Sequence, residues 1–236
     1  MHGRLTSGLS LTNDLVQRVK GHRSLAADIV VCPPFTLLWP VSEVLVDCPI
    51  KLGAQDCHPQ NHGAYTGDIS AAMLIDVGCR YVILGHSERR YGHGEDSSLV
   101  ARKIAAAQQA GLTVILCVGE TKAEFDSGKK TEAVEAQLRL SLPEKVTAAN
   151  LVVAYEPVWS IGTGVTPEVT DVEKMHRHIR KVLGPAGEAM QVVYGGSVTP
   201  QLAETYLTSS EIDGFLVGSV SLNADGFWGV CEKVRA

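Results

Sequence analysis

Residues 151–164 read LVVAYEPVWSIGTG, and the first five of them form a continuous apolar run. Such a run predicts a parallel strand that is buried on both faces, because a half-exposed strand would alternate apolar and polar residues. Six further runs of this kind occur along the chain: Ile29–Cys32, Ile50–Ala54, Tyr81–Leu84, Val114–Val118, Gln191–Tyr194 and Gly214–Val217.

Helical patterns alternate with these strands: Leu11–Lys20, Leu37–Val46, Ser70–Val77, Ser97–Ala110, Lys130–Leu140, Glu168–Leu183 and Pro200–Thr208. This alternation predicts an α/β fold, either an open doubly wound sheet or a closed (β/α)8 barrel. A spacing of about 30 residues per unit is typical of the barrel, and no GxGxxG follows a strand. We therefore predict one barrel domain over residues 1–236. The first helix lacks a preceding strand, so the first β-strand is expected to be absent from the chain as given.

The composition excludes several classes of function. The 236 residues carry a net charge of −5 without a basic stripe, which argues against a nucleic-acid or anionic-membrane partner. No apolar run approaches the roughly 18 residues of a membrane span, and the start does not resemble a signal peptide. Six cysteines without a CxxC pair favour free thiols in the cytoplasm. Cys57, His58 and His62 lack a second ligand pair at zinc spacing, so we expect no metal.

Two titratable residues lie at the carboxyl ends of apolar strands, where active sites are found in both architectures. Glu156 directly follows its strand, and one residue separates His86 from the end of another. Glu156 precedes a proline, so its carboxylate leaves a buried strand end and enters a loop. Partial burial raises the pKa of such a carboxyl toward working pH, which suits a general base. The alternative interpretation is a structural carboxylate that pairs with an arginine. His86 precedes a charged run that can begin a helical turn. The amino end of a helix disfavours a cation, so the imidazole of His86 could stay neutral there and donate a hydrogen bond. A lone histidine there is usually structural, but pairing with Glu156 would favour catalysis.

Short glycine-rich turns follow the later strands: Gly162-Thr163-Gly164, Gly195-Gly196-Ser197 and Gly218-Ser219. Glycine lets backbone amides close on an anion, and turns after the last barrel strands are a recurrent phosphate site. Each turn alone is weak evidence, but together they indicate a small phosphorylated substrate.

Four motifs, read together, resemble the triosephosphate isomerase family: GHSERR at 85–90, YEPVWSIGTG at 155–164, YGGS at 194–197 and LVGS at 216–219. The resemblance also covers residues 53–55 and 63–67 and runs in register from Met1 to the C-terminus. It implies a TIM barrel enzyme that interconverts dihydroxyacetone phosphate and D-glyceraldehyde 3-phosphate through an enediolate, without a cofactor.

The resemblance also implies roles for individual residues. Glu156 would be the base that moves a proton between C1 and C2, and His86 would be the neutral electrophile that polarises the carbonyl. Ser87 and Glu88 would lie beside them. The range 157–164 would be a closing lid, with Trp159 near one hinge. The backbone amides of four residues would hold the phosphate: Gly162, Ser197, Gly218 and Ser219.

Members of this family are homodimers, and the range Gln55–Asp68 matches the loop that inserts into the partner subunit. Thr66 would then lie near the partner's active site. The alternative is a solvated loop without a partner.

The chain departs from the family pattern at its start. The family motif G-N-W-K-M/L-x-G contains a substrate-contacting asparagine and lysine, and this chain begins at the Met of that motif. A start assigned too far downstream and a shortened protein are the two explanations. Losing one preorganised charge costs about 10²–10³ in rate, and losing a barrel strand leaves two buried edges unpaired. We therefore expect the 236 residues alone to be poorly folded or nearly inactive. The alternative function is a catalytically impaired homologue that binds phosphorylated ligands.

Smaller departures affect the phosphate site, the loop and the lid. Ser219 replaces the second glycine of the usual pair, so its side chain must point away from the phosphate. Asp68 replaces a glutamate, and Ser160 and Val165 alter the lid.

Overall fold

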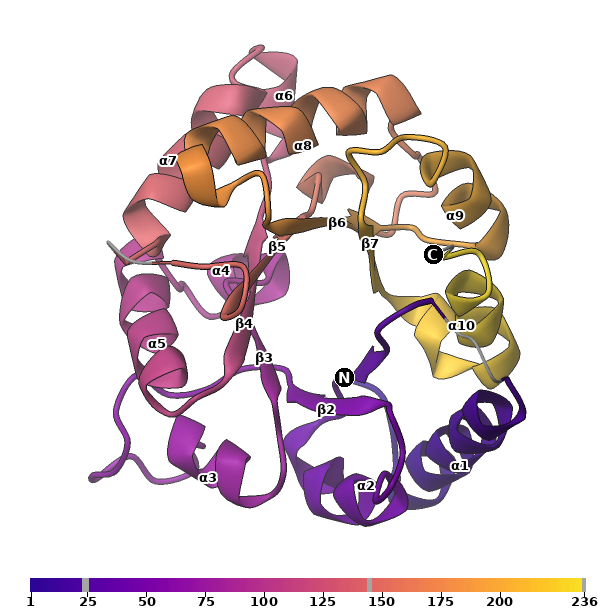
Figure 1. The fold of residues 1–236 in the computed structure, drawn as a ribbon. Coiled ribbons are helices and arrows are strands. Elements are labelled where there is room, and N and C mark those ends of the chain that lie inside the picture. Colours follow the sequence, from indigo (N-terminus) through magenta and orange to yellow (C-terminus); the bar gives the residue numbers. More distant parts are fainter. Residues whose placement is uncertain (23–25, 144–145, 235–236) are drawn as a thin grey trace.

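The computed structural model describes residues 1–22, 26–143 and 146–234. Seven strands form one curled sheet in the order β1 to β7, and each is parallel to the next. Figure 1 shows the helices arranged around the outside of this sheet. The strands are β1 (Val30–Val31), β2 (Lys51–Ala54), β3 (Tyr81–Leu84), β4 (Thr113–Val118), β5 (Leu151–Tyr155), β6 (Gln191–Gly196) and β7 (Gly214–Val217). All seven strands predicted from the sequence are present.

The helices follow the strands in alternation. They are α1 (Leu5–Gly21), α2 (Leu38–Val44), α3 (Ala71–Asp76), α4 (Ser87–Gly92), α5 (Ser97–Gln109), α6 (Lys122–Asp126), α7 (Lys130–Ser141), α8 (Val169–Val182), α9 (Pro200–Tyr206) and α10 (Ala224–Cys231). The predicted start of α1 at Leu11 was wrong. The helix begins at Leu5, where tertiary packing outweighs the poor propensity of the first turns, since Gly8 lies directly against Leu37.

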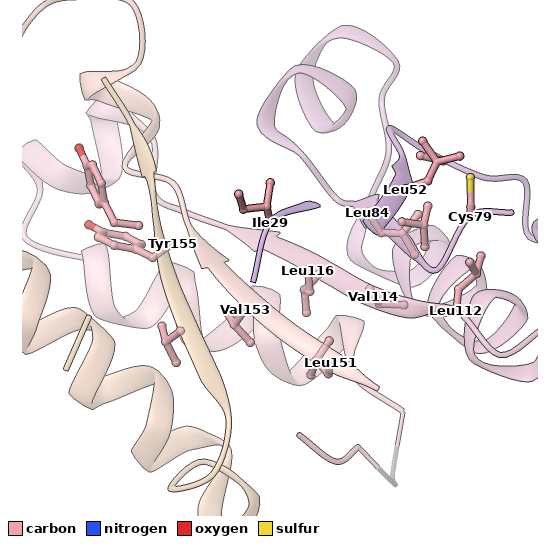
Figure 2. Packing of buried hydrophobic residues seen from close by; sticks show 14 of the residues in the cluster. Ile29, Leu52, Cys79, Leu84, Leu112, Val114, Leu116, Leu151, Val153 and Tyr155 are labelled. Atoms are coloured by element: carbon pink, nitrogen blue, oxygen red, sulfur yellow. The ribbon is translucent and has the colours of Figure 1, made fainter. Parts of the chain in front are cut away.

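The strands divide the apolar side chains between two cores. Alternate residues of β3, β4 and β5 point outward and pack beneath the helices, as Figure 2 shows for Leu84, Leu116 and Val153. The intervening residues point inward and form a smaller cluster inside the curled sheet: Ile83, Ile115, Cys117, Val152 and Ala154. Every strand in the middle of the sheet is therefore buried on both faces, as the continuous apolar runs predicted.

The two outermost strands differ from the central ones. Within the described residues, β1 and β7 each pair with a neighbour on one side only. All four residues of β7 are half-buried, whereas all five residues of β5 are buried. Helices α1 and α10 pack against each other beside these edges, and Arg18 pairs with Asp225 between them. The described residues thus form one curled parallel sheet of seven strands surrounded by helices, as the alternation in the sequence predicted.

Candidate active site

Glu156 lies directly after β5, at the carboxyl end of the sheet, and only 3% of its surface is exposed. Its backbone N–H donates to the carbonyl of Val118 at 2.8 Å, which extends the β4–β5 pairing by one residue. Its Oε1 atom lies 3.1 Å from Nε2 of His86, and its Oε2 atom accepts from the backbone N–H of Ser87 at 3.2 Å. In the part of the chain that the structure describes, no arginine lies within ion-pairing distance of this carboxylate. The structure therefore brings together the two residues that the sequence singled out.

His86 caps the N-terminus of α4, a position fixed by the end of β3. Its Nδ1 atom accepts from the backbone N–H of Glu88 at 3.3 Å, so the proton of the neutral imidazole is assigned to Nε2. This tautomer directs its N–H at Oε1 of Glu156. Ser87 is buried beside the pair, whereas Glu88 is exposed.

Opposing influences act on the protonation of His86. Burial lowers the pKa of the imidazole, but the hydrogen bond to Glu156 and the charge of that carboxylate outweigh it. With a smaller contribution from Glu88, the pKa of His86 is raised. This direction differs from the expected effect of the helix end alone, and the nearby Glu156 carboxylate is the physical reason.

Two glycines make room for Glu156. A Cβ atom on Gly119, just past β4, would lie 1.7 Å from the backbone oxygen of Glu156. A Cβ atom on Gly195 in β6 would lie 2.9 Å from the Cγ atom of Glu156. A larger residue at Gly119 must displace the backbone of Glu156, and one at Gly195 must displace its side chain, so both glycines are required by close approach rather than by backbone conformation.

The four residues expected to hold phosphate all lie at the carboxyl end of the sheet. Gly162 is in the exposed part of the 157–164 segment with a φ of 71°, a conformation that favours glycine. Ser197 follows β6 and is half-buried, and Gly218 and Ser219 follow β7, where a 3₁₀ turn starts at Ser219. Their backbone amides are thus on the same side of the sheet as Glu156.

Comparisons with known proteins agree with this geometry. A family model described as "Triosephosphate isomerase" matches residues 1–234. The chain belongs to the triosephosphate isomerase family. The triosephosphate isomerase of Granulibacter bethesdensis is 47% identical over 235 residues, which cover 96% of this chain and 94% of the relative. That of Afipia carboxidovorans is 48% identical over 209 residues, covering 87% and 83%. The crystal structure of triosephosphate isomerase from Bartonella henselae superposes with a TM-score of 0.91 at 37% identity, covering 100% of this chain and 96% of that one.

Membership of the triosephosphate isomerase family confirms the resemblance carried by the four motifs, and the structural match confirms the TIM barrel. The chain spans most of the length of these relatives.

One feature of the segment at residues 157–164 was not predicted. Glu120, which follows β4 and is fully buried, accepts hydrogen bonds from Trp159 Nε1 at 2.7 Å and from the hydroxyl of Tyr155 at 3.1 Å. Burial raises the pKa of Glu120, although these two donors oppose the increase. The indole of Trp159 also packs on Phe125 with ring centroids 4.4 Å apart. Glu120 therefore anchors the start of the 157–164 segment.

Arg90 is a second residue whose role was missed, although it lies within the GHSERR motif. Its guanidinium donates to the carbonyl of Gly85 at 2.8 Å and to that of Cys117 at 3.4 Å. Arg90 thereby links Gly85, which follows β3 and immediately precedes His86, to Cys117 near the end of β4. The guanidinium also donates to the hydroxyls of Ser97 at 3.1 Å and Ser141 at 3.5 Å, and contacts of these kinds leave no local pattern in the sequence.

A cluster of four charged residues lies at the root of the 55–68 loop, and we call it the charged cluster: Asp56, Arg89, Glu95 and Lys103. The ammonium group of Lys103 lies 2.8 Å from Asp56 and 2.6 Å from Glu95, and all three residues are buried. Burial raises the pKa of Asp56. In Glu95 burial acts in the same direction, but the hydrogen bonds from Lys103 and Arg89 outweigh it and lower the pKa.

Two kinds of feature are absent from the described residues. No group of three or more His, Cys, Asp or Glu side chains could hold a metal ion in the part of the chain that the structure describes. Among the same residues, no helix is both long and apolar enough to cross a membrane.

Proposed function

We propose that the protein interconverts dihydroxyacetone phosphate and D-glyceraldehyde 3-phosphate, as the names of its relatives indicate. The observation that carries this proposal is the buried Glu156 carboxylate, 3.1 Å from His86 Nε2 at the carboxyl end of a family-matched barrel. A buried base beside a donor suits proton transfer next to a carbonyl group.

In this reaction the Glu156 carboxylate takes a proton from C1 of dihydroxyacetone phosphate. The electron pair of the C–H bond forms the C1–C2 double bond, and the carbonyl electrons move to the oxygen on C2. His86 donates its Nε2 proton toward that oxygen and moves protons between the two enediolate oxygens. Glu156 then returns a proton to C2, which gives D-glyceraldehyde 3-phosphate.

Glu156 must first leave its bonds to His86 and Ser87 before its carboxylate can reach C1. This movement removes the group that raises the pKa of His86, so the imidazole becomes easier to keep neutral as the substrate binds. The α4 amino end, with Glu88 N–H donating to Nδ1, supports the same neutral tautomer.

The phosphate is proposed to bind the backbone amides of Gly162, Ser197, Gly218 and Ser219. Amides at turns and at the start of a short helix favour an anion. Closure of residues 157–164 would bring Gly162 to the phosphate and exclude water from the enediolate. The exposed state of residues 162–166 is compatible with such a movement.

We also propose a homodimer in which the 55–68 loop enters the partner subunit. Figure 1 shows the segment between β2 and α3 extending away from the helices. Tyr65 is 46% exposed, and its ring packs on His58, 4.1 Å away, while His58 Nε2 lies 3.5 Å from Asp68. The loop is thus ordered by its own contacts and presents an aromatic side chain. Sedimentation velocity should show a dimer that Tyr65→Asp converts to a monomer; a monomer before substitution would contradict the proposal.

A cytoplasmic location is proposed as well. All six cysteines are free in the structure, which suits a reducing compartment.

The activity is tested by coupling the product to an NADH-dependent dehydrogenase, with micromolar protein so that a rate lowered by about 10²–10³ stays measurable. We expect turnover that falls by about 10²–10⁴ in His86→Gln and stays unchanged in His93→Gln, which alters an exposed histidine. Turnover that His86→Gln leaves unaffected would contradict the proposed mechanism.

A further inference from the structure

Gln137, on α7, makes an unusual pair of contacts to one backbone position. Its Nε2 atom donates to the carbonyl of Gly119 at 2.9 Å, and its Oε1 atom accepts from the backbone N–H of the same residue at 2.9 Å. Gly119 is buried and lies one residue past β4. The side-chain amide of Gln137 therefore hydrogen-bonds both the N–H and the C=O of Gly119, a buried residue beyond the end of the β4 strand pairing.

The turn that contains Gly119 is in direct contact with the base. The ideal Cβ position on Gly119 lies 1.7 Å from the carbonyl oxygen of Glu156, so the two backbones touch without space between them. On either side, the Val118 carbonyl accepts from the Glu156 N–H at 2.8 Å, and the Glu120 carbonyl accepts from the Val158 N–H at 3.1 Å. Three consecutive residues of the turn thus contact the chain at 156–158.

We propose that Gln137 is a positioning residue, which fixes the turn at residues 118–120 and through it the backbone of Glu156 and the start of the lid segment. Within the described residues, Gln137 makes no hydrogen bond with Glu156, and it acts through Gly119. The kinetic part of this proposal rests on the proposed function, whereas the structural part does not.

The physical reason is the cost of leaving buried backbone groups without partners. If an apolar side chain replaces Gln137, both the N–H and the C=O of Gly119 lose their hydrogen bonds, and the turn must move to reach water or other partners. Because Gly119 is packed against Glu156, the base moves with it. A misplacement of about 1 Å at a catalytic group can lower the rate about 10²-fold.

The experiment compares Gln137→Leu with Gln108→Leu in the full chain. Gln108 is a matched control: it is also a half-buried helical glutamine that donates to a backbone carbonyl, that of Asn150 at 3.4 Å. Asn150 precedes β5, at the end of the strand opposite to Glu156. Loss of either glutamine lowers stability, but only loss of Gln137 should affect the site.

Two readouts are taken well below the unfolding temperature of each variant. For Gln137→Leu, we expect kcat to fall at least about tenfold while KM changes by less than about twofold, since a ground-state contact is not removed. We also expect the pKa of His86, followed by NMR, to fall toward the ordinary value of about 6.5 as Glu156 moves away. Gln108→Leu should change neither quantity.

Gln137→Glu supplies the conservative test and replaces the leucine variant if that one does not fold. When protonated, the introduced carboxyl group can donate and accept as the glutamine amide does, whereas its ionised form repels the Gly119 carbonyl. The ratio of the kcat of this variant to that of the unsubstituted chain should therefore rise as the pH is lowered.

The two proposals fail in different ways. If the unsubstituted chain shows no isomerase turnover, the proposed function fails, and the His86 titration still tests Gln137. An unchanged kcat together with an unchanged His86 titration in the Gln137 variants would overturn the positioning role. A lower unfolding temperature alone would also overturn it, because that result indicates a structural role only.

Discussion

The contact between Gly119 and Glu156 gives the sharpest prediction, the effect of Gly119→Ala. The added Cβ atom would lie 1.7 Å from the carbonyl oxygen of Glu156, and ordinary contact begins at 3.4 Å, so the two backbones must separate by 3.4 − 1.7 = 1.7 Å. Since a shift of about 1 Å can cost about 10² in rate, kcat should fall by at least about 10²-fold, or about 2.7 kcal/mol in activation free energy. Overpacking should also lower the free energy of unfolding by about 1–3 kcal/mol.

The assay measures kcat and KM at a temperature where thermal unfolding shows each variant to be folded. Gly21→Ala is the matched control, because no atom lies within 4 Å of its ideal Cβ position and its φ is not positive. It should leave kcat unchanged and stabilise α1 by up to about 1 kcal/mol. A folded Gly119→Ala protein with kcat within about threefold of the original would refute the claim that this contact positions Glu156.

Three further predictions concern other parts of the structure. Trp159→Phe removes a hydrogen bond to the buried Glu120 carboxylate, which is worth about 1.5–3 kcal/mol. Limited proteolysis within residues 161–166 should therefore accelerate about tenfold or more. An unchanged cleavage rate would show that this bond does not hold the segment. Lys103→Met leaves the two buried carboxylates of the charged cluster to share Arg89, and this should lower the free energy of unfolding in urea by about 3–5 kcal/mol. A loss below about 1 kcal/mol would contradict this. Burial lowers the pKa of His176 to about 4, so below about pH 6.5 the unfolded chain binds a proton that the folded chain does not, and stability is lost as the pH falls. Between pH 7 and 5 the free energy of unfolding should fall by about 2 kcal/mol. This loss should disappear in His176→Gln and persist in His93→Gln. An unchanged dependence of the unfolding free energy on pH in His176→Gln would contradict the prediction.

The strands could be predicted well because burial on both faces leaves a direct trace in the sequence. The range Leu151–Tyr155 was predicted with the bounds that the structure shows, since all five residues are apolar and all five are buried. Helices depended more on tertiary contacts. Helix α10 was not predicted: it contains Gly226 and Gly229, and Gly229 packs closely on Pro200, a contact that no local pattern indicates.

The reacting groups of the candidate site could be predicted, but their supports could not. Glu156 and His86 stand next to strands, and their chemistry is visible in their residue types. Gln137 binds the backbone N–H and C=O of Gly119, and Arg90 donates to the backbone carbonyl of Cys117. Any polar helix residue has the same local signature as these two. The upward shift in the pKa of His86 also required the fold, because it depends on a carboxylate 70 positions away in the chain (156 − 86).

Exchange of solvent deuterium into dihydroxyacetone phosphate, followed by proton NMR in D₂O, tests directly whether Glu156 removes the proton. This measurement detects proton removal at C1 even when net turnover is slow. We expect the unsubstituted chain to exchange the C1 proton, and Glu188→Gln, which alters an exposed glutamate, to do so at the same rate. Exchange by Glu156→Gln should fall to the level of the reaction without protein. Exchange that continues at the original rate in Glu156→Gln would show that another group is the base.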